Sequence, residues 1–207
     1  MSTFLEMQQR IADDLNRSDL TAQIKKAITR AVSFYQKEPF WFKETSGSFS
    51  TIAAQKAYGA SDGIPSDIDT IRYMYCAVGG TNYEIKPTDI VDLENNNPAQ
   101  SQGDPPTDYA WFQKKIYFSL IPNQVRTVTL YYTKTYTALS ADADTNDWTT
   151  TAEDLIEARS RWWLYKRVIM DKMEADEAKI EELEALGGLR EISEGYVAQG
   201  RIPPTSF

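Results

Sequence analysis

The order of hydrophobic patterns is the feature that most limits the folds open to this chain. Helical patterns occupy both ends, and a segment rich in Ser, Thr and Tyr lies between them. Apolar residues that recur every three or four positions predict amphipathic helices, and alternating β-branched and aromatic residues predict strands. We therefore predict an α+β fold. A bundle of N- and C-terminal helices is expected from residues 1–44 together with 148–188. An inserted β domain is expected from residues 45–147, and an extended C-terminal arm from residues 189–207.

A helical hairpin is predicted at the start of the chain. Apolar residues have helical spacing in residues 4–15 and again in residues 20–35, with a polar turn between the two segments. Pro39 ends the second helix because the residue before a proline is disfavoured in the α region. The aromatic cluster Phe40-Trp41-Phe42 follows at once. This cluster fits either a plug between helices and sheet or an anchor for contact with another subunit.

The central segment is predicted to form an antiparallel β-sandwich or a small barrel. Gly and Pro punctuate it at intervals typical of turns, and strand-forming residues fill the stretches between them. A short helix is expected at residues 88–94, before a polar loop. The candidate strands are residues 47–52, 70–78, 83–86, 109–113, 115–120 and 125–136.

A single long helix is predicted after Asp147, because apolar residues keep helical spacing for roughly nine turns. The pair Gly187-Gly188 supplies the signal that ends it. Its acidic second half, residues 171–184, fits either an ordinary solvated face or an acidic surface turned toward something that must not adhere. The residues expected to share one apolar face are Leu155, Trp162, Ile169, Met173, Ile180 and Leu183.

The last residues are predicted to form an extended arm. Pro203 and Pro204 forbid a helix, and several apolar side chains would stay in water if the arm merely dangled. A frayed terminus is one interpretation, and docking on a neighbouring subunit or a partner is the preferred one. Residues of the arm and two residues of the aromatic cluster are the predicted partner-binding residues. They are Trp41, Phe42, Tyr196, Arg201, Ile202, Pro203, Pro204 and Phe207.

The composition argues against catalysis and against sequence-specific binding of nucleic acid. His is absent, which removes the commonest general base and the commonest metal ligand. The net charge of −8 disfavours binding that depends on neutralising phosphates. Glycine-rich phosphate loops, nucleophile elbows and paired Cys ligands are all missing from the sequence. We therefore predict a protein that is not an enzyme, with no catalytic residue and no cofactor.

One segment partly matches a calcium-binding loop. Oxygen-bearing side chains between Asp142 and Glu153 fall at several ligand positions of an EF-hand-like loop. Asp147 occupies the position where this loop needs Gly, and the preceding segment is a predicted strand instead of a helix. A polar lead-in to the next helix is therefore the preferred interpretation, and a calcium site is the alternative.

The sequence also bears on compartment and on redox chemistry. No apolar run approaches the roughly 20 residues that a membrane helix needs. The N-terminal residues enter an amphipathic pattern without the features of a signal peptide, so we expect cytoplasmic synthesis and no membrane contact. Cys76 is the single Cys and lies in an apolar run, which predicts a buried structural thiol.

Four segments in a fixed order carry a resemblance to a known family. They are the N-terminal helix pair closing on residues 40–44, the turn at 64–68, the run at 103–110, and the strand at 128–132 ahead of Leu139-Ser140. In this order they resemble the head-to-tail adaptor proteins of tailed bacteriophages, also called connector or head-completion proteins, particularly those of podovirus type.

The resemblance implies a structural protein of the virion neck and tail region, synthesised in the host cytoplasm. Such adaptors form a dodecameric ring beneath the portal, extend the DNA channel and give the tail a platform. The implied partners are further copies of the chain, the portal protein and a tail or nozzle protein. DNA is expected to pass through the channel without specific binding.

Two other classes of function stay open at this point. A carbohydrate-binding or tail-fibre-associated β module would use the Tyr-rich strand, with Tyr131 and Tyr132 as stacking residues, although alternation within a sheet explains these residues more simply. A hydrolase built on paired carboxylates is the third interpretation, since Asp and Glu are abundant.

Overall fold

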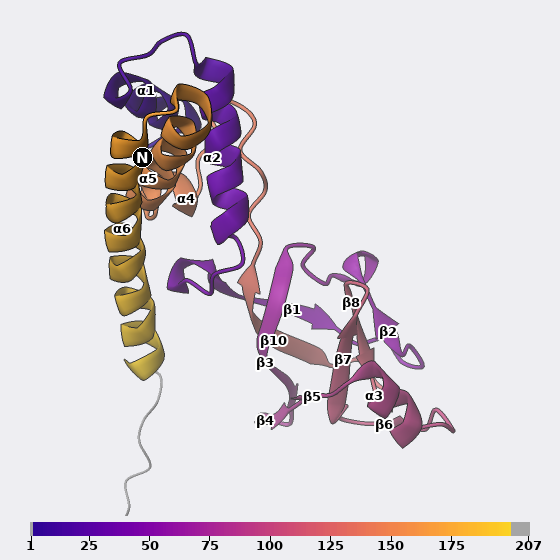
Figure 1. Cartoon of the computed structure of the whole chain (residues 1–207). Coiled ribbons are helices and arrows are strands. Elements are labelled where there is room, and N and C mark those ends of the chain that lie inside the picture. The colour runs from indigo at the N-terminus through magenta and orange to yellow at the C-terminus, as the bar shows by residue number, and fades with distance from the viewer. Residues whose placement is uncertain (1, 200–207) are drawn as a thin grey trace, which may run out of the picture. The chain divides into compact units, whose positions relative to one another are not determined.

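The protein divides into a helical unit and a β unit in the computed structural model, which describes residues 2–199 (Figure 1). The described residues up to Phe42 and from Tyr136 onward form the helical unit, and residues 43–135 form the β unit. The β unit is therefore inserted between the two parts of the helical sequence, and the predicted α+β class is confirmed. Residues 136–147, which we expected in the β domain, go with the helices because Leu139 is buried in their core.

The helical unit begins with the predicted hairpin. Thr3 caps the first helix: its hydroxyl oxygen accepts from the backbone nitrogen of Glu6 at 3.2 Å, and its own backbone nitrogen donates to the Glu6 carboxylate at 2.7 Å. This reciprocal pair satisfies two backbone donors that a helix start otherwise leaves unpaired. The helices of the unit are α1 (Phe4–Asp14), α2 (Thr21–Tyr35), α4 (Asp147–Thr150), α5 (Glu153–Leu164) and α6 (Lys172–Gln199), with a 3-10 turn, η1, at Trp41–Lys43.

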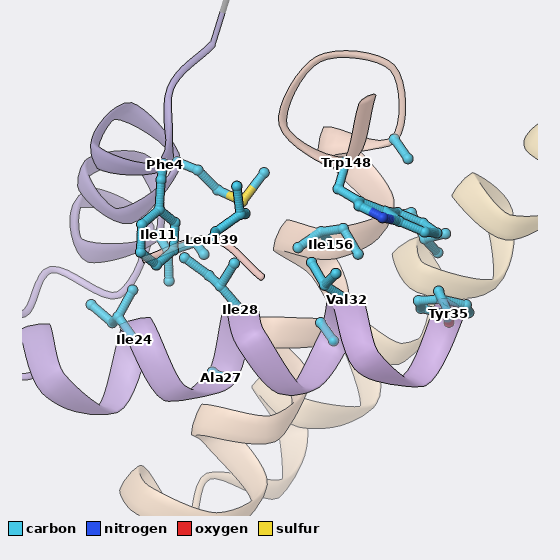
Figure 2. Packing of buried hydrophobic residues seen from close by; sticks show 14 of the residues in the cluster. Phe4, Ile11, Ile24, Ala27, Ile28, Val32, Tyr35, Leu139, Trp148 and Ile156 are labelled. Atoms are coloured by element: carbon cyan, nitrogen blue, oxygen red, sulfur yellow. The ribbon is translucent and has the colours of Figure 1, made fainter. Parts of the chain in front are cut away.

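One hydrophobic core joins these helices. Figure 2 shows that the buried faces of α1 and α2 meet Leu139, Trp148 and Ile156. Trp148 is fully buried, and its ring nitrogen donates to the side-chain oxygen of Gln36 at 3.1 Å, so the one polar atom of the indole has a partner. Burying an aliphatic or aromatic side chain contributes about 1.5–3 kcal/mol, and burial of this kind holds the bundle together.

The single long C-terminal helix predicted from the sequence is wrong. Helix α5 passes into one turn of π-helix, η3 (Tyr165–Ile169), and Met170 then adopts a left-handed backbone with a φ of 63°. Asp171 starts α6 by accepting from the backbone nitrogens of Met173 at 3.0 Å and Glu174 at 3.2 Å. The chain therefore turns back at Met170, and α5 and α6 pack together as a pair.

Ion pairs between α5 and α6 confirm that these helices are antiparallel. Arg161 pairs with Glu181, and Arg159, two residues earlier, pairs with the later residue Glu182. The apolar stripe expected along one helix is consequently divided between two. Its first member, Leu155, is buried, whereas its members on α6 are exposed: Met173, Ile180 and Leu183.

The extended arm predicted from residue 189 differs from the structure over residues 189–199, because α6 continues to Gln199. The Gly pair at 187–188 does not end this helix. Leu189 is buried against the core beyond the glycines, and this contact favours one more helical segment. The rest of the predicted arm, residues 200–207, lies outside the described residues.

The β unit contains two four-stranded sheets and one two-stranded sheet. The first sheet is antiparallel, with the order β1-β10-β3-β4, and the second has the order β2-β8-β7-β5, in which β5 and β7 are parallel. The short strands β6 and β9 pair with each other. The strands are β1 (Glu44–Ser50), β2 (Ala57–Tyr58), β3 (Ile68–Val78), β4 (Thr81–Glu84), β5 (Lys86–Pro87), β6 (Gln102–Gly103), β7 (Asp108–Phe112), β8 (Lys115–Phe118), β9 (Ile121–Pro122) and β10 (Thr127–Lys134).

The two larger sheets share one core, so the β unit is a sandwich, and the described residues form no closed barrel. Phe49 of β1 stacks on Phe118 of β8, with ring centroids 6.3 Å apart, and contributions come from both sheets throughout the core. The predicted strands all correspond to observed ones, although the segment expected at 83–86 is split between β4 and β5. The expected short helix is α3 (Ile90–Asn96), two residues later than predicted.

Candidate functional site

The aromatic cluster after α2 lies in the helical unit. Phe40 is buried, and the ring of Phe42 stacks on it with centroids 5.3 Å apart and meets the edge of Trp148 at 5.2 Å. The Tyr136 hydroxyl donates to the backbone oxygen of Phe42 at 2.8 Å. Burial and hydrogen bonding to Asp147 raise the pKa of Tyr136, in that order of size. The ring of Phe42 thus has a packing role within this unit, and its role in binding a partner stays a prediction.

Trp41 and Tyr196, two of the predicted partner-binding residues, lie together. Their rings stack with centroids 5.9 Å apart and planes inclined by 10°. Tyr196 belongs to the last turns of α6, continues the inward face of that helix and is 57% exposed. The stack therefore leaves much of the tyrosine ring open to a partner. The other predicted residues, Arg201, Ile202, Pro203, Pro204 and Phe207, lie outside the described residues.

A groove between α2 and α5 combines cations with aromatic rings. It has a volume of about 780 Å³. Phe34 lies on its α2 side and is 54% exposed. The groove is lined by Ala27, Arg30, Ala31, Ser33, Phe34, Arg159, Trp162, Trp163 and Arg167. We call this surface the cation–aromatic groove.

The cations of the groove lie over its rings. The guanidinium of Arg159 is 4.0 Å from the ring centroid of Phe34 and 4.5 Å from that of Trp162. Arg30 lies 5.1 Å from the centroid of Trp163, and the amine of Lys166 lies 4.7 Å from that of Trp162. These distances are within the range of cation–π attraction, which favours this arrangement of side chains in the absence of a partner.

A buried carboxylate also holds Arg159 in place. Its guanidinium donates to Glu182 at 2.9 Å, and Lys179 pairs with the same carboxylate at 3.0 Å. The hydroxyl of Tyr35 donates to Glu182 as well, and burial followed by this hydrogen bond raises the pKa of Tyr35. Because Glu182 is only 1% exposed on its side chain, this network fixes the position of Arg159 at the groove.

The face of α6 turned away from α5 carries a second notable surface. Ala175, Ala178 and Glu182 are buried on the inner face of this helix. On the opposite face, helical spacing aligns three exposed apolar residues with five exposed carboxylates. We call this surface the outer stripe, and it consists of Met173, Asp176, Glu177, Ile180, Leu183, Glu184, Glu191 and Glu194.

The groove was not predicted from the sequence, and of the outer stripe only an acidic surface within residues 171–184 was suggested, although each surface has a signal in the sequence. Arg30 and Phe34 are four residues apart, and Arg159, Trp162 and Lys166 follow one another at intervals of three and four. Such spacing places side chains on one helical face and marks cations interleaved with aromatic rings. The outer stripe was hidden because its apolar residues were assigned to the buried face of one continuous helix.

The β unit has an exposed tyrosine face. Tyr73 and Tyr75 of β3 and Tyr131 of β10 gather on one side of the first sheet, with ring centroids 5.9–6.5 Å apart. Tyr132 points to the other side, where it is buried and donates to Asp67 at 3.2 Å. Burial raises the pKa of Tyr132 to about 12. Of the two tyrosines suggested for sugar stacking, only Tyr131 is therefore accessible.

The oxygens of the partial calcium loop have separate partners. Asp142 pairs with Lys25 at 2.8 Å, and Glu153 pairs with Arg10 at 2.9 Å. Asp144 accepts from the backbone nitrogens of Ser140 and Ala141, which lower its pKa. Within residues 2–199 no group of three or more acidic, Cys or His side chains converges as metal ligands would.

Two further sequence expectations concern Cys76 and membrane contact. Cys76 is fully buried in β3, as predicted, and burial raises the pKa of its thiol. A helix with the length and apolar character of a membrane span does not occur in the described part of the chain.

The exposed features of both units are surfaces suited to packing against other molecules, which is the character of an interaction protein. A family model described as SU10 adaptor protein matches residues 2–204. The chain therefore belongs to the SU10 adaptor protein family. This membership confirms the resemblance to phage head-to-tail adaptors and supports a structural adaptor role. A search among curated proteins finds no match.

Proposed function

We propose that the protein is a ring-forming, non-enzymatic adaptor in the neck of a phage virion. It docks on the portal, extends the DNA channel and gives the tail its attachment platform, with a dodecamer as the proposed ring. The observation that carries this proposal is the family match over residues 2–204, which includes both the helical and the β unit.

The charge of the chain supports a channel role. A net charge of −8 repels the phosphates of DNA, so that DNA can slide past the ring without specific binding. The exposed apolar side chains of α6 and the exposed ring of Phe34 support assembly, because patches of this kind mark surfaces that a partner covers.

The contact with the portal or a neighbouring subunit is proposed for the C-terminal end and the aromatic cluster. Trp41 and Tyr196 form an exposed aromatic stack at the end of α6, next in sequence to residues 201–207. Arg, Pro and aromatic side chains in this stretch suit docking on another protein surface. The proposed contact residues remain Trp41, Phe42, Tyr196, Arg201, Ile202, Pro203, Pro204 and Phe207.

The main test is a mass measurement of the protein alone and mixed with portal rings. The proposal expects a complex with a defined number of adaptor copies in the mixture, which native mass spectrometry and electron microscopy would both detect. If portal rings and adaptor stay separate under all conditions, while circular dichroism shows the adaptor folded, the proposed function is wrong.

Two variants test which residues make the contact. Deleting residues 200–207 is expected to abolish binding to portal rings without changing the stability of the helical unit, because α6 remains complete. Tyr196→Ala is expected to weaken binding to a smaller extent. Unchanged binding of the deletion variant would remove the C-terminal residues from the proposed contact, and Tyr83→Ala on β4 serves as a matched control.

A second candidate function is carbohydrate binding or association with a tail fibre by the β unit. The tyrosine face favours it, since Tyr73, Tyr75 and Tyr131 present adjacent rings on which a sugar could stack. This candidate expects glycan binding that Tyr131→Ala abolishes and that Tyr83→Ala, outside the face, leaves intact. A glycan array with no signal for the wild-type protein would eliminate it.

A further inference from the structure

The cation–aromatic groove has positive charge without a matching anion. Among the described cations of the helical unit, Lys26, Lys37 and Lys172 have no ion pair, and neither do the three residues Arg30, Lys166 and Arg167. The last three all lie at or beside the groove, in a chain whose acidic residues outnumber its basic ones. Cations gathered around aromatic rings suit a partner that presents carboxylates together with apolar side chains.

The outer stripe of α6 has those chemical properties. Its five carboxylates have no ion pair among the described residues, and its apolar members are 74% exposed at Met173, 58% at Ile180 and 55% at Leu183. Leaving this apolar area in water costs about 25 cal/mol for each Å². Like charges on adjacent turns also repel one another. Both costs fall when a cationic, aromatic surface covers the stripe.

We propose that the outer stripe of one copy of the chain docks in the cation–aromatic groove of the next copy. This interface rests on the proposed ring, and it names the two surfaces that build it. Arg30, Lys166 and Arg167 pair with carboxylates of the neighbouring stripe, and the apolar residues of the stripe pack on the exposed ring of Phe34.

The two surfaces are formed by different helices, which fits a ring. The groove is lined by residues of α2 and α5, and the stripe is on the face of α6 opposite Glu182, which is buried and pairs with Arg159 of α5. A copy that offers its stripe to one neighbour therefore keeps its groove free for another. Contacts between unlike surfaces of this kind propagate from copy to copy and close into a ring when the rotation allows.

DNA is a poorer occupant of the groove than a second copy. The net charge of −8 opposes its approach, and the lining includes the exposed ring of Phe34, which phosphates do not satisfy. The Arg159 guanidinium is already engaged by Glu182, Phe34 and Trp162, so it is not free to follow a phosphate backbone. DNA binding by the groove is nevertheless one of the outcomes that the experiment separates.

The experiment exchanges the charges of the two surfaces. The groove variant is Arg30→Glu/Arg167→Glu, and the stripe variant is Glu177→Lys/Glu184→Lys. All four positions lack ion pairs among the described residues, and all four side chains are exposed, so the fold should persist. Each variant alone is expected to lose ring assembly on portal rings, because like charges then face each other at every interface.

Mixing restores complementarity. When the groove variant and the stripe variant are combined in equal amounts, each interface that joins unlike copies pairs opposite charges, and rings of alternating composition should form. A chain carrying all four substitutions should assemble by itself. Native mass spectrometry detects both results, since the two variants differ in mass.

Several results would overturn the proposal. Normal rings from either variant alone would show that the charged surfaces do not meet, and so would failure of both the mixture and the fourfold variant. Intact rings that have lost only portal binding or only DNA binding would assign the groove to that other partner.

The control Lys86→Glu/Lys114→Glu makes the same change in net charge as the groove variant, but on exposed residues of the β unit, and should assemble normally. Wild-type protein serves to separate the two hypotheses. If wild-type protein does not assemble with portal rings, the proposed function fails, whereas normal wild-type assembly with insensitive variants rejects only this interface.

Discussion

The ring of Tyr196 lies flat on the ring of Trp41, with centroids 5.9 Å apart and planes inclined by 10°. The two residues are far apart in sequence, and the stack joins the last turns of α6 to the aromatic cluster that follows α2. Aromatic pairs of this geometry contribute about 0.5–1.5 kcal/mol beyond burial of their area. The stack thus anchors an end of α6 that two glycines would otherwise weaken.

Trp41→Ala should loosen the end of α6 without unfolding the protein. A loss of about 0.5–1.5 kcal/mol corresponds to amide exchange about two- to tenfold faster in residues 190–196. Hydrogen–deuterium exchange with mass spectrometry measures this effect. Tyr196→Leu should give the same local change, and the double variant should exchange no faster than either single one. Uniform acceleration over the whole helical unit would instead mean that Trp41 supports the global fold.

The sequence predicted the N-terminal hairpin and the main strands better than the C-terminal helices. The hairpin of α1 and α2 and the main strands follow from periodicity, because each buries one face of a regular element. The reversal at Met170 was missed because apolar spacing continues through it. Asp171, followed three residues later by Glu174, is a start signal for a new helix that could have been recognised. The two-residue strands are too short for any alternation to be visible.

The candidate surfaces were less predictable, because they depend on contacts between helices distant in the sequence. Trp41 was predicted as part of the aromatic cluster and Tyr196 as an apolar side chain of the C-terminal arm, but nothing local indicated that they stack on each other. The groove needs α2 beside α5, and the outer stripe needs the antiparallel position of α6. Once the turn at Met170 is known, Met173, Ile180 and Leu183 fall on the outer face without further information.

Removing the arginine from the buried Arg159–Glu182 pair should be costly. Glu182 is 1% exposed, so Arg159→Met leaves a buried charge with fewer partners, and we expect a loss of about 3–5 kcal/mol. Adding Glu182→Gln should recover part of this loss, because the amide carries no charge and still accepts from Tyr35. Urea denaturation of the wild type, the two single variants and the double variant gives the coupling free energy between Arg159 and Glu182.

Arg161→Met is the matched control for this cycle. Arg161 leaves the same helix and pairs with Glu181 and Asp14, whose side chains are 43% and 45% exposed. Exposed pairs contribute at most about 1 kcal/mol, so this variant should be only slightly destabilised. Equal losses for Arg159→Met and Arg161→Met would contradict the role of burial.

The carboxyl of Asp19 should titrate far below its ordinary range. Side-chain hydrogen bonds from Arg17, both at 2.7 Å, lower the pKa of Asp19 from 3.8 to about 2. A lowered folded-state pKa contributes stability that is present above pH 3.8 and is lost as the pH falls toward about 2. NMR titration of the carboxyl carbon measures the value directly. In Arg17→Gln the pKa of Asp19 should rise toward 3.8, while that of Asp144, lowered by the backbone of Ser140 and Ala141, should not move.

Replacing Gly187 with Ala should stabilise the helical unit. This glycine lies inside α6, and a Cβ built there meets nothing within 4 Å. Alanine in an exposed helical position is more favourable than glycine by about 0.5–1 kcal/mol, because glycine loses more backbone freedom on folding. Thermal denaturation followed by circular dichroism should therefore show a higher midpoint for the variant.

Gly80→Ala in the β unit should have the opposite effect, although a Cβ there also meets nothing within 4 Å. Gly79 and Gly80 form the two-residue turn between β3 and β4 with φ of 59° and 84°, a left-handed conformation that side chains with a Cβ disfavour. Space is equal at the two sites, so only the backbone conformation distinguishes them. If Gly187→Ala lowered the midpoint as Gly80→Ala does, the helix would be interrupted at the glycines, and the end of α6 would have to be the extended arm that the sequence first suggested.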